Sequence, residues 1–372
     1  MSSVKILHTA DIHLDAPYRF LGTGGPDQRQ QVKKTFERVC RIAVDEGFDL
    51  LLVSGDLFDS NSVSERTSDW LTSQLKSVSI PTLICPGTHD CLAERSVYRD
   101  TRVKWPSNVR VFSDGSEALD VPELNVTVHA RANTSPRSTH SPIEGLKRTG
   151  ASRWEIAMAH GSMVIPGKVE SADFPITSDE IDSSELDYIA LGHWHSWGDY
   201  SAGGVKAVYP GAPERMEFSG GLGAFAAVTL GDEGTFVERR EVGARKMEEV
   251  SISVAGMTSA EDLRREIAAL ASPNMALRVI LSGLSDISFQ ADSEALQQEL
   301  ASGFLFLEII DRSHPSLADI TSDAFPERLV IGKFVRGMAE RIEQARGDEQ
   351  LVGVLEDAMR VGVAVLQGRK VF

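Results

Sequence analysis

Short motifs rich in Asp and His follow one another along the first half of the chain, and each stands just after an apolar run. The motifs are Asp11-Ile12-His13, Gly55-Asp56-Leu57-Phe58-Asp59, Gly87-Thr88-His89-Asp90, Ala159-His160-Gly161 and Gly192-His193-Trp194-His195. A single His-x-His or Asp-x-His pair arises by chance on many strands. The whole series in one chain constrains both its fold and its chemistry.

The apolar runs before the motifs are typical of strands that are buried on both faces of a layered α/β core. They are Val4-Lys5-Ile6-Leu7, Leu50-Leu51-Leu52-Val53, Thr82-Leu83-Ile84-Cys85, Ile156-Ala157-Met158 and Tyr188-Ile189-Ala190-Leu191. Parallel strands end at a common edge of their sheet, where the following loops converge and ligands bind. We therefore expect the Asp and His side chains to meet at one rim.

The alternative is that these His are ordinary surface or core residues and that the Asp are turn formers. A motif gains weight when its structural context fits, and here every motif follows a strand-like run. Carboxylate oxygens mixed with imidazole nitrogens suit Mn, Fe or Zn better than Ca or Mg. The sequence therefore predicts a site for divalent metal ions.

The order of the motifs resembles that of the calcineurin-like metallophosphoesterases: Asp-x-His, Gly-Asp-x-x-Asp, Gly-Asn-His, His and Gly-His-x-His. Within that family, the opening Leu7-His8-Thr9-Ala10-Asp11-Ile12-His13-Leu14-Asp15 looks like the SbcD-type DNA repair nucleases of bacteria. The segment Tyr209-Pro210-Gly211-Ala212-Pro213-Glu214 resembles the strand and turn after the last metal motif of that branch. The resemblance is specific over residues 4–245. Beyond them, only the layout of a small capping module and terminal helices agrees.

The resemblance implies a role for each motif residue. One metal ion would be held by Asp11, His13 and His195, the other by His160 and His193, with Asp56 as the bridging carboxylate. Two divalent ions about 3.5–4 Å apart would lower the pKa of a bridging water and hold the phosphoryl oxygens for in-line attack. Mn is the expected metal, with Fe and Zn as alternatives.

The remaining motif residues surround these ligands. His89 is the candidate general acid for the leaving oxygen. Asp15, Asp59 and Asp90 would either accept hydrogen bonds from ligand imidazoles or cap helix N-termini, and a capping or structural role is favoured for Asp90. The family has Asn where this chain has Thr88, and a neutral hydroxyl is a poor metal ligand. The second metal site is therefore expected to be weaker, with a water in the missing position.

Length and composition restrict the class of protein. A chain of 372 residues with 42% hydrophobic and 25% charged residues is expected to form two or three globular units. No apolar run is long enough to span a bilayer, and the N-terminus enters a strand without a signal-peptide pattern. Three cysteines without a metal or redox pattern predict reduced thiols in a cytoplasmic protein.

A net charge of −16 argues against a nucleic-acid surface that covers the whole protein. Two basic segments flank metal motifs and either position a phosphate backbone or form ordinary solvated faces. The first contains Arg95, Arg99, Arg102, Lys104 and Arg110, opposed by Asp100; the second contains Arg131, Arg137, Lys147, Arg148 and Arg153, opposed by Glu144.

Periodicity predicts the elements between the motifs. Apolar residues from Val32 to Ala43 recur at helical spacing before Gly47, and Ser64 leads a second helix that ends before Pro81. The stretch 133–150 is predicted to be a surface loop. Strands 205–209, 225–230 and 235–242 are expected to close a second sheet in antiparallel fashion. Two sheets face to face with helices outside give a four-layer α-β-β-α sandwich, the fold that the resemblance implies.

The pattern changes after Val242. Strands 250–254, 277–281 and 304–310 with helices 260–270 and 293–300 predict a small α/β unit without a ligand cluster. Two helices follow, the first with the apolar stripe Ile331, Phe334, Val335, Met338 and Ile342. We therefore expect a metallophosphoesterase domain at 1–245, a capping domain at 246–325 and C-terminal helices at 326–372. The tail stripe either packs on the chain itself or docks a partner.

The sequence is compatible with three functions. The first is a Mn-dependent nuclease that cleaves DNA, as exonuclease or endonuclease, together with an SbcC-like coiled-coil ATPase. The second is a phosphodiesterase or phosphatase for small molecules or phosphoproteins, because the metal centre is indifferent to what carries the phosphate. The third is a metal-binding regulatory subunit that cleaves poorly, which Thr88 favours. Whether the protein forms a homodimer stays open as well.

Overall fold

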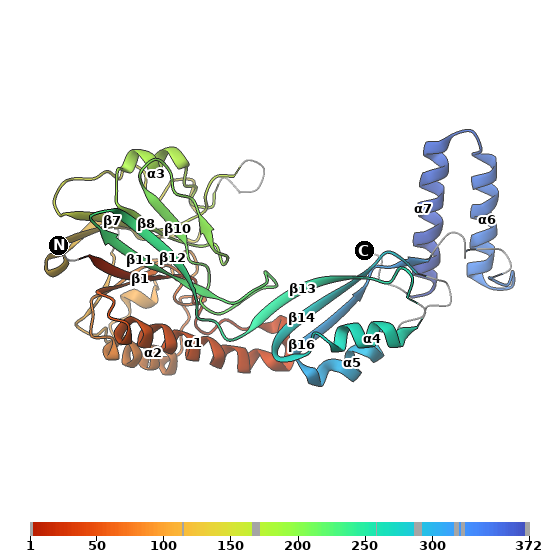
Figure 1. Ribbon diagram of the computed structural model, residues 1–372, viewed down its shortest axis with the longest axis horizontal. Helices are drawn as coiled ribbons and strands as arrows, with labels where there is room; N and C mark the ends of the chain where they lie inside the picture. The colour runs from red at the N-terminus through yellow and green to blue at the C-terminus, as the bar shows by residue number, and fades with distance from the viewer. Residues whose placement is uncertain are drawn as a thin grey trace. The chain divides into compact units, whose positions relative to one another are not determined.

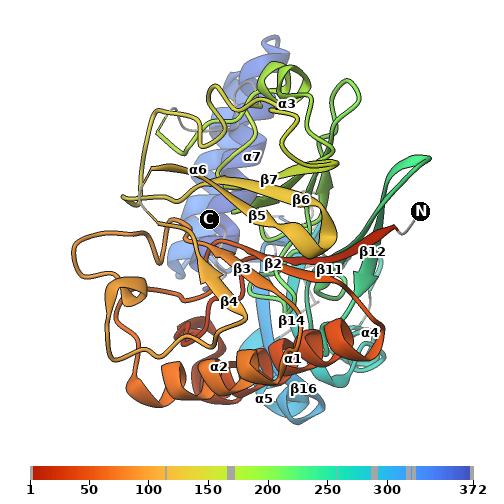
Figure 2. The same ribbon diagram turned by 90° about the vertical axis from the view of Figure 1, so that its left-hand side faces the viewer.

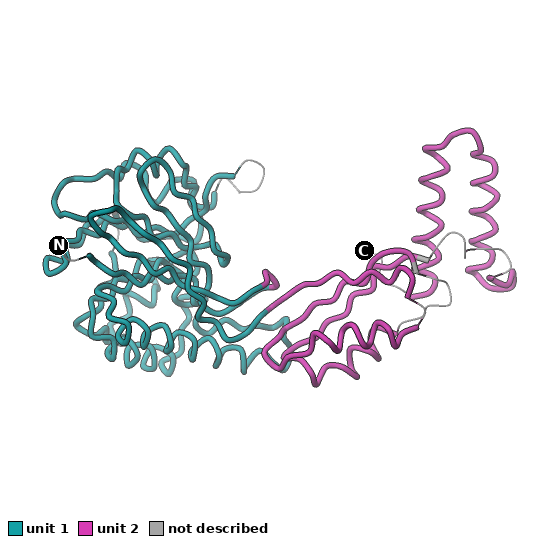
Figure 3. Tube along the Cα trace, viewed as in Figure 1, with its two compact units in different colours: residues 1–217, 221–246 teal, residues 218–220, 247–372 magenta. Residues whose placement is uncertain are grey.

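The computed structural model describes residues 3–113, 115–165, 172–257, 259–285, 292–315, 320 and 324–368. The chain divides into two compact units (Figure 3). Unit 1 comprises residues 1–217 and 221–246, and unit 2 comprises residues 218–220 and 247–372. Unit 2 contains both the expected capping domain and the expected C-terminal helices, and their separation into two domains stays a prediction.

Unit 1 contains two six-stranded sheets. The first has the order β12 (Gly234–Glu241), β11 (Ala224–Gly231), β1 (Val4–Thr9), β2 (Leu50–Ser54), β3 (Thr82–Cys85) and β4 (Val109–Val111). Strands β1 to β4 are parallel, whereas β11 runs antiparallel to β1 and β12 antiparallel to β11. Helices α1 (Gly25–Asp45) and α2 (Glu65–Ser77) cover its outer face (Figure 2).

The second sheet has the order β5 (Ser116–Val121), β6 (Val126–Arg131), β7 (Trp154–His160), β8 (Tyr188–Gly192), β10 (Lys206–Tyr209) and β9 (Gly198–Asp199). Strands β6, β7, β8 and β10 are mutually parallel. Helix α3 (Ser178–Ser184) packs on its outer side through the fully buried Ile181. Short 3-10 turns lie at Arg19–Gly24, Val97–Arg99 and Pro122–Leu124.

The main core lies between the two sheets, which face each other in Figures 1 and 2. Ile6 and Leu52 from the first sheet pack in one cluster with Ile156, Met158 and Ala190 from the second. A strand buried on both faces needs apolar residues at every position, which explains the unbroken apolar runs before the motifs. The four-layer α-β-β-α sandwich expected from the sequence is confirmed.

The pairing of the late strands differs from the prediction. Strands β11 and β12 were expected to close the second sheet, but they extend the first sheet through the β1–β11 ladder. Strand β10 joins the second sheet parallel to β8 instead of antiparallel. Alternating patterns identify a strand, but its partners depend on contacts far away in the sequence, so local periodicity could not assign them.

Unit 2 contains a three-stranded sheet of β13 (Lys246–Ser253), β14 (Ser272–Ser282) and β16 (Phe304–Asp311). Helices α4 (Ala260–Ala268) and α5 (Ser293–Leu300) bury Leu263, Ile267 and Leu296 in one core with this sheet. A 3-10 turn at Ala301–Gly303 and a two-stranded ladder of β15 (Leu284–Ser285) and β17 (His314–Pro315) complete the elements of this part.

The tail forms a helical hairpin of α6 (Val330–Gln344) and α7 (Glu349–Leu366). The predicted apolar stripe of α6 is buried within this hairpin: Val335 and Met338 pack in one cluster with Met359 and Val363 of α7. Gly362 of α7 allows the Phe334 ring of α6 to approach closely, since a Cβ at Gly362 would lie 2.2 Å from that ring. Among the described residues, no helix is long and apolar enough to cross a membrane.

Candidate metal centre

The loops that carry the motifs leave the carboxyl ends of β1, β2, β3, β7 and β8. Backbone hydrogen bonds join these loops to one another. The Asp11 and His13 N–H groups donate to the carbonyls of Gly55 and Asp56, at 3.1 and 3.0 Å. The Gly161 N–H donates to the Gly192 carbonyl at 3.1 Å. The strand ends therefore gather the motifs at one rim, as expected.

Two glycines allow the two sheets to approach each other at this rim. A Cβ on Gly192 would lie 1.7 Å from the Ser54 carbonyl oxygen, and a Cβ on Gly55 would lie 2.0 Å from Nδ1 of His160. Gly55 also has a φ of +88°, which side chains rarely adopt. The glycines of the second and fifth motifs are thus needed for close contact between β2, β7 and β8.

Several ligand-type residues have left-handed backbone conformations. The φ angles are +54° at Asp11, +48° at His13, +49° at Asp56 and +113° at His193. Such conformations raise the energy of a non-glycine residue and concentrate at functional sites, where the surrounding structure enforces them. All four residues lie in the loops that follow β1, β2 and β8.

The ligand-type side chains form groups whose coordinating atoms lie within 4.8 Å of one another. One group contains Asp11, His13 and His195, and a second contains Asp56, His160 and His193. This division coincides with the two ligand sets that the family resemblance implies. A third group contains His13, Asp59 and His89 and overlaps the first through His13.

Asp56 lies between the two ligand groups. Its Oδ2 is 3.1 Å from Nε2 of His160, in its own group, and 3.7 Å from Nε2 of His13, in the other. Its Oδ1 accepts a hydrogen bond from the His89 N–H at 2.8 Å. A carboxylate in this position reaches both groups, which is the geometry that a bridging ligand requires.

The residues of the two groups fit divalent cations. Nδ1 of His13 donates to the Asp59 carboxylate at 3.2 Å, whereas its Nε2 is buried without a hydrogen-bond partner and faces Asp56. A buried imidazole nitrogen without a partner is uncommon unless it binds an ion or water. Carboxylates and imidazoles together form a donor set suited to borderline divalent metals.

The pKa shifts of the clustered residues also fit a bound cation. Burial raises the pKa of Asp11 to about 6. Burial opposes the ionised form of Asp56, but His160 and His13 hold its pKa well below the usual range. Burial likewise opposes a charge on His160, yet the carboxylate of Asp56 raises its pKa to about 9. The negative charge of the buried carboxylates must therefore be balanced locally, by a proton or by a cation.

Burial and the neighbouring His13 lower the pKa of His195 to about 3. Burial and then His160 lower the pKa of His193 as well. Both imidazoles therefore stay neutral near pH 7, and a neutral imidazole is the form that binds a metal ion.

Thr88 lies beside the second ligand group. Its hydroxyl donates to Oδ2 of Asp56 at 3.2 Å and lies 3.5 Å from Nε2 of His160. The position is thus the one expected for a ligand, but the short hydroxyl is engaged with Asp56. The expectation of a weaker second site stays a prediction.

His89 extends from the loop after β3 to the mouth of the site. Its Nδ1 lies 3.0 Å from the Asp59 carbonyl oxygen, which can only accept, so Nδ1 carries a proton. Its ring meets the ring of His13 edge to face, with centroids 4.7 Å apart. Thr88, His89, Arg137, Asp173 and His193 are among the residues that line an open pocket of about 370 Å³ at this point.

The three carboxylates expected around the ligands have different surroundings. Asp59 contacts Nδ1 of His13, as an orienting acceptor would. Asp15 instead accepts from the Thr67 hydroxyl at 2.9 Å and lies 3.8 Å from Nζ of Lys33. Asp90 is fully buried and accepts hydrogen bonds from the backbone N–H groups of Gly87 and Phe58 and from the Tyr98 hydroxyl, at 2.6–3.1 Å. Its geometry is that of an anchor for the loop around Thr88.

Three residues at the site belong to no motif and were not predicted from the sequence. Asp173 lies 3.1 Å from Nε2 of His193, Asn133 donates to the carbonyl of His160 at 3.0 Å, and Arg215 donates to the carbonyl of His195 at 3.4 Å. They come from loops far from the ligands in sequence, so only the folded chain identifies them. Arg215 follows the recognised turn at residues 209–214, which was the one available signal.

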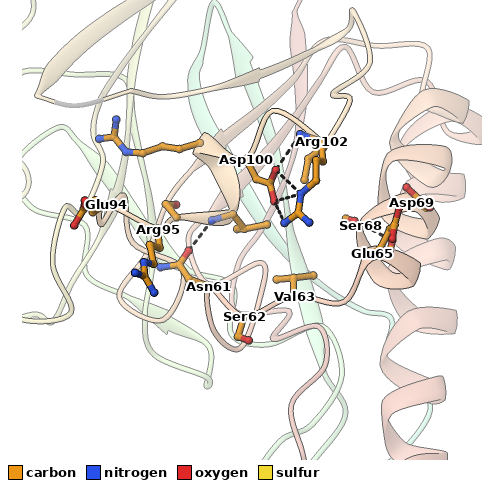
Figure 4. A pocket seen from close by; sticks show the side chains of 14 residues that line it. Asn61, Ser62, Val63, Glu65, Ser68, Asp69, Glu94, Arg95, Asp100 and Arg102 are labelled. Atoms are coloured by element: carbon orange, nitrogen blue, oxygen red, sulfur yellow. Dashed lines mark hydrogen bonds and ion pairs between the residues drawn. The ribbon is translucent and has the colours of Figure 1, made fainter.

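The basic segments are largely occupied by contacts within the chain. Arg102 forms an ion pair with Asp100 at 2.6 Å in a pocket of about 520 Å³, which Figure 4 shows from close by. Glu65, Asp69 and Glu94 also line this pocket, so acidic groups balance its arginines. In the second segment, Arg148 pairs with Asp187 at 2.6 Å and Arg131 donates to the carbonyls of Ser141 and Glu144. These contacts occupy Arg102, Arg131 and Arg148 within the chain.

Comparisons with known proteins agree with the geometry. The calcineurin-like phosphoesterase family profile matches residues 4–197. YhaO of Bacillus subtilis, an uncharacterized metallophosphoesterase, is 28% identical over 229 residues, which cover 57% of this chain and 53% of YhaO. The DNA double-strand break repair protein Mre11 of Aeropyrum pernix is 26% identical over 275 residues, which cover 67% of this chain and 64% of Mre11.

The matched part of this chain thus spans about half to two thirds of the length of these relatives. A solved protein of Thermus thermophilus is 12% identical, and the match covers 64% of this chain and 99% of that protein with a TM-score of 0.40. The family profile covers more than half of the chain and all of the ligand-type motifs. The chain therefore belongs to the calcineurin-like phosphoesterase family.

Proposed function

We propose that this protein is a two-metal phosphodiesterase that cleaves DNA and acts as the nuclease subunit of an SbcD-type repair complex. The observation that carries the proposal is the meeting of two ligand groups at Asp56, which lies within 3.7 Å of imidazoles from both. Relatives named as DNA double-strand break repair proteins, from Aeropyrum pernix and Saccharolobus solfataricus, support DNA as the substrate.

Each ligand group would hold one divalent ion, with Mn²⁺ as the proposed metal and Fe or Zn as alternatives. Asp11, His13 and His195 would hold the first ion, His160 and His193 the second with Thr88 beside it, and Asp56 would serve both. Such a pair supplies a water nucleophile at neutral pH and neutralises the charge that builds up on the phosphoryl oxygens.

His89 would act as the general acid for the leaving oxygen. Because Nδ1 of His89 donates to the Asp59 carbonyl, Nε2 is the nitrogen left to face a substrate in the open pocket. Asp59 would have a double role, since its carbonyl orients His89 and its carboxylate contacts His13. Asp90 would keep the loop between β3 and His89 in place through its backbone contacts, whereas Asp15 would link the first motif to α2 through Thr67.

An open pocket suits a polymeric substrate, whose flanking nucleotides must extend beyond the reacting phosphate. The net charge of −16 would oppose strong binding of a polyanion by this chain alone. We therefore expect DNA binding by the isolated protein to be weak and sensitive to salt. A partner that contributes basic surface would raise the affinity.

We propose an SbcC-like coiled-coil ATPase as that partner, docked on the α6–α7 hairpin. The stripe of α6 is covered by α7, but the hairpin exposes other apolar side chains, among them Val330 at 73% and Val354 at 60%. Exposed apolar residues on paired helices fit helix-in-groove recognition. We expect this assembly in the cytoplasm, since the three cysteines are free and buried; a homodimer stays open.

Cleavage of labelled linear DNA in the presence of Mn²⁺ tests the proposal. Single- and double-stranded DNA should be degraded, and a small phosphodiester such as bis-p-nitrophenyl phosphate should be a poorer substrate. Asp56→Ala should abolish cleavage and metal binding together, because it removes a ligand shared by both ions. Hydrolysis of the small phosphodiester without cleavage of DNA would contradict DNA as the substrate.

Thr88 supports a second candidate, a regulatory subunit that binds metal and partner but cleaves poorly. A hydroxyl engaged with Asp56 is a weaker ligand than the amide of the family motif. In that case the unmodified protein should bind the ATPase and two metal ions but leave DNA intact at saturating Mn²⁺.

A further inference from the structure

Asp173 is a carboxylate at the rim of the metal centre that belongs to no motif. The surrounding backbone fixes its position between β7 and α3. The Ser162 N–H donates to the Asp173 carbonyl at 3.2 Å, and the Phe174 N–H donates to the Ser138 carbonyl at 2.9 Å. Its side chain is 34% exposed and points to Nε2 of His193, at 3.1 Å from Oδ2.

The hydrogen bonds around Asp173 have a defined direction. The indole Nε1 of Trp194 can only donate, and it donates to the Ser162 hydroxyl at 3.1 Å. Ser162 then uses its own proton for Oδ2 of Asp173, at 2.5 Å. An ionised carboxylate only accepts, so the contact with His193 requires a proton on Nε2 of that imidazole.

A proton on Nε2 leaves the lone pair of His193 on Nδ1. Since Nε2 contacts Asp173, Nδ1 is the nitrogen left for the second ligand group, whose coordinating atoms lie within 4.8 Å of one another. Trp194, the residue after His193, is itself held in place by packing. Its ring stacks on the Tyr209 ring with centroids 4.9 Å apart. The chain from Trp194 through Ser162 and Asp173 thus selects one tautomer and one orientation of His193.

We infer that Asp173 is a positioning residue that presents Nδ1 of His193 to the second divalent cation. The inference rests on the two-metal centre of the proposed function and names a residue outside the ligand set. A carboxylate behind a ligating imidazole fixes its tautomer and strengthens it as a ligand, typically by 10–100-fold in affinity. Such support would matter most at the second site, where a weaker ligand set is expected from Thr88.

Titration calorimetry with Mn²⁺ on the full chain tests the inference. Asp173→Ala should weaken one of two Mn²⁺ sites by about 10–100-fold and leave the other unchanged. Ser162→Ala, which removes the hydroxyl but keeps the carboxylate, should weaken the same site by less than about tenfold. Asp179→Ala, an exposed aspartate in the first turn of α3, is the matched control and should bind both ions normally.

A spectroscopic readout separates positioning from a loss of fold. In ¹⁵N-histidine-labelled protein, long-range ¹H–¹⁵N spectra should show the His193 proton on Nε2, and Asp173→Ala should move it to Nδ1 or into exchange. Unchanged Mn²⁺ affinity and an unchanged tautomer in Asp173→Ala would overturn the inference. If the unmodified protein binds fewer than two Mn²⁺ ions, the two-metal proposal itself fails, which is a different result.

Discussion

His89 and Thr88 are neighbours in one loop, but their side chains point in different directions. The His89 backbone N–H holds Asp56, and its ring points to the open pocket. The Thr88 hydroxyl points inward to Asp56 and His160. His89 therefore faces the open pocket and Thr88 faces the ligand-type residues, so each position can be changed separately.

His89→Ala should leave the metal content near normal and lower turnover by about 10²–10⁴-fold. The reason is that the ring is the proposed proton donor to the leaving group and lies outside the two ligand groups. Metal analysis and kcat at saturating Mn²⁺ measure the two effects. His140→Ala, a change at an exposed histidine in the 133–150 loop, is the control. Loss of metal from His89→Ala would show that His89 is a ligand and not an acid.

Thr88→Asn should tighten the second metal site and raise activity at limiting Mn²⁺, because it restores an amide oxygen beside Asp56 and His160. Activity titrated against Mn²⁺ should therefore reach its half-maximum at a lower concentration than in the unmodified protein. Thr88→Val, which keeps the shape but removes the hydroxyl, should shift the curve the other way. Identical curves for Thr88→Asn and the unmodified protein would mean that another group already fills the position.

The gathering of the Asp and His residues at one rim could be predicted from the sequence, because each motif carries its own local signal after an apolar run. The left-handed backbones at Asp11 and His193 could not, since no local pattern requires them. Asp173 could not either, because its partner His193 is twenty positions away and no spacing rule links the two.

Secondary structure elements with local signals were predicted well. Gly47, with a φ of +65°, follows the end of α1, and the Ser64 side chain caps α2 by accepting from the Thr67 N–H. Helix α5 has the predicted bounds, Ser293–Leu300. The hairpin of β5 and β6 was missed, although polar and apolar residues alternate along β6 as in a strand at the edge of a core. The placement of β11 next to β1 required contacts that no local pattern encodes.

Glu155, the second residue of β7, is a buried carboxylate that binds the preceding loop. Glu155 accepts hydrogen bonds from the backbone N–H groups of Thr149 and Ala151 and contacts His129 at 3.1 Å. Its side chain is fully buried. Burial would raise the pKa of Glu155, but the hydrogen bonds from Thr149 and His129 lower it to about 2.

Glu155→Gln should therefore lower the free energy of unfolding by roughly 3 kcal/mol at pH 7. Because the folded pKa is depressed, this contribution is complete above the usual value of 4.5 and is lost as the pH falls through about 2. Urea unfolding at several pH values measures the difference from the unmodified protein. Glu144→Gln, at an exposed position of the same loop, is the control. A difference that stays constant down to pH 2.5 would contradict the assigned pKa.

On the scale of the whole molecule, the tail hairpin has a core of its own. The cluster of the three-stranded sheet with α4 and α5 contains no residue of α6 or α7. The hairpin cluster instead joins both helices with Ile320 and Phe325. Residues 369–372 of the expected C-terminal segment lie outside the described part of the chain.

Deletion of residues 327–372 should leave the protein folded, metal-bound and able to cleave simple DNA, yet unable to co-purify with a co-expressed SbcC-like ATPase. The reason is that the deletion removes the docking hairpin and spares the other cores. Circular dichroism, metal analysis and co-purification check the three properties. Val354→Lys, on the exposed face of α7, should lose the partner without loss of fold. An insoluble or unfolded truncation would place the tail in the core and contradict docking.

The central claim is that two divalent ions bind between the two sheets, on either side of Asp56. Anomalous diffraction at the Mn absorption edge, from crystals grown with Mn²⁺, tests it most directly. We predict two peaks, one enclosed by Asp11, His13 and His195 and one by His160 and His193, with Asp56 in contact with both. A single peak, or peaks outside these two groups, would contradict the two-metal centre.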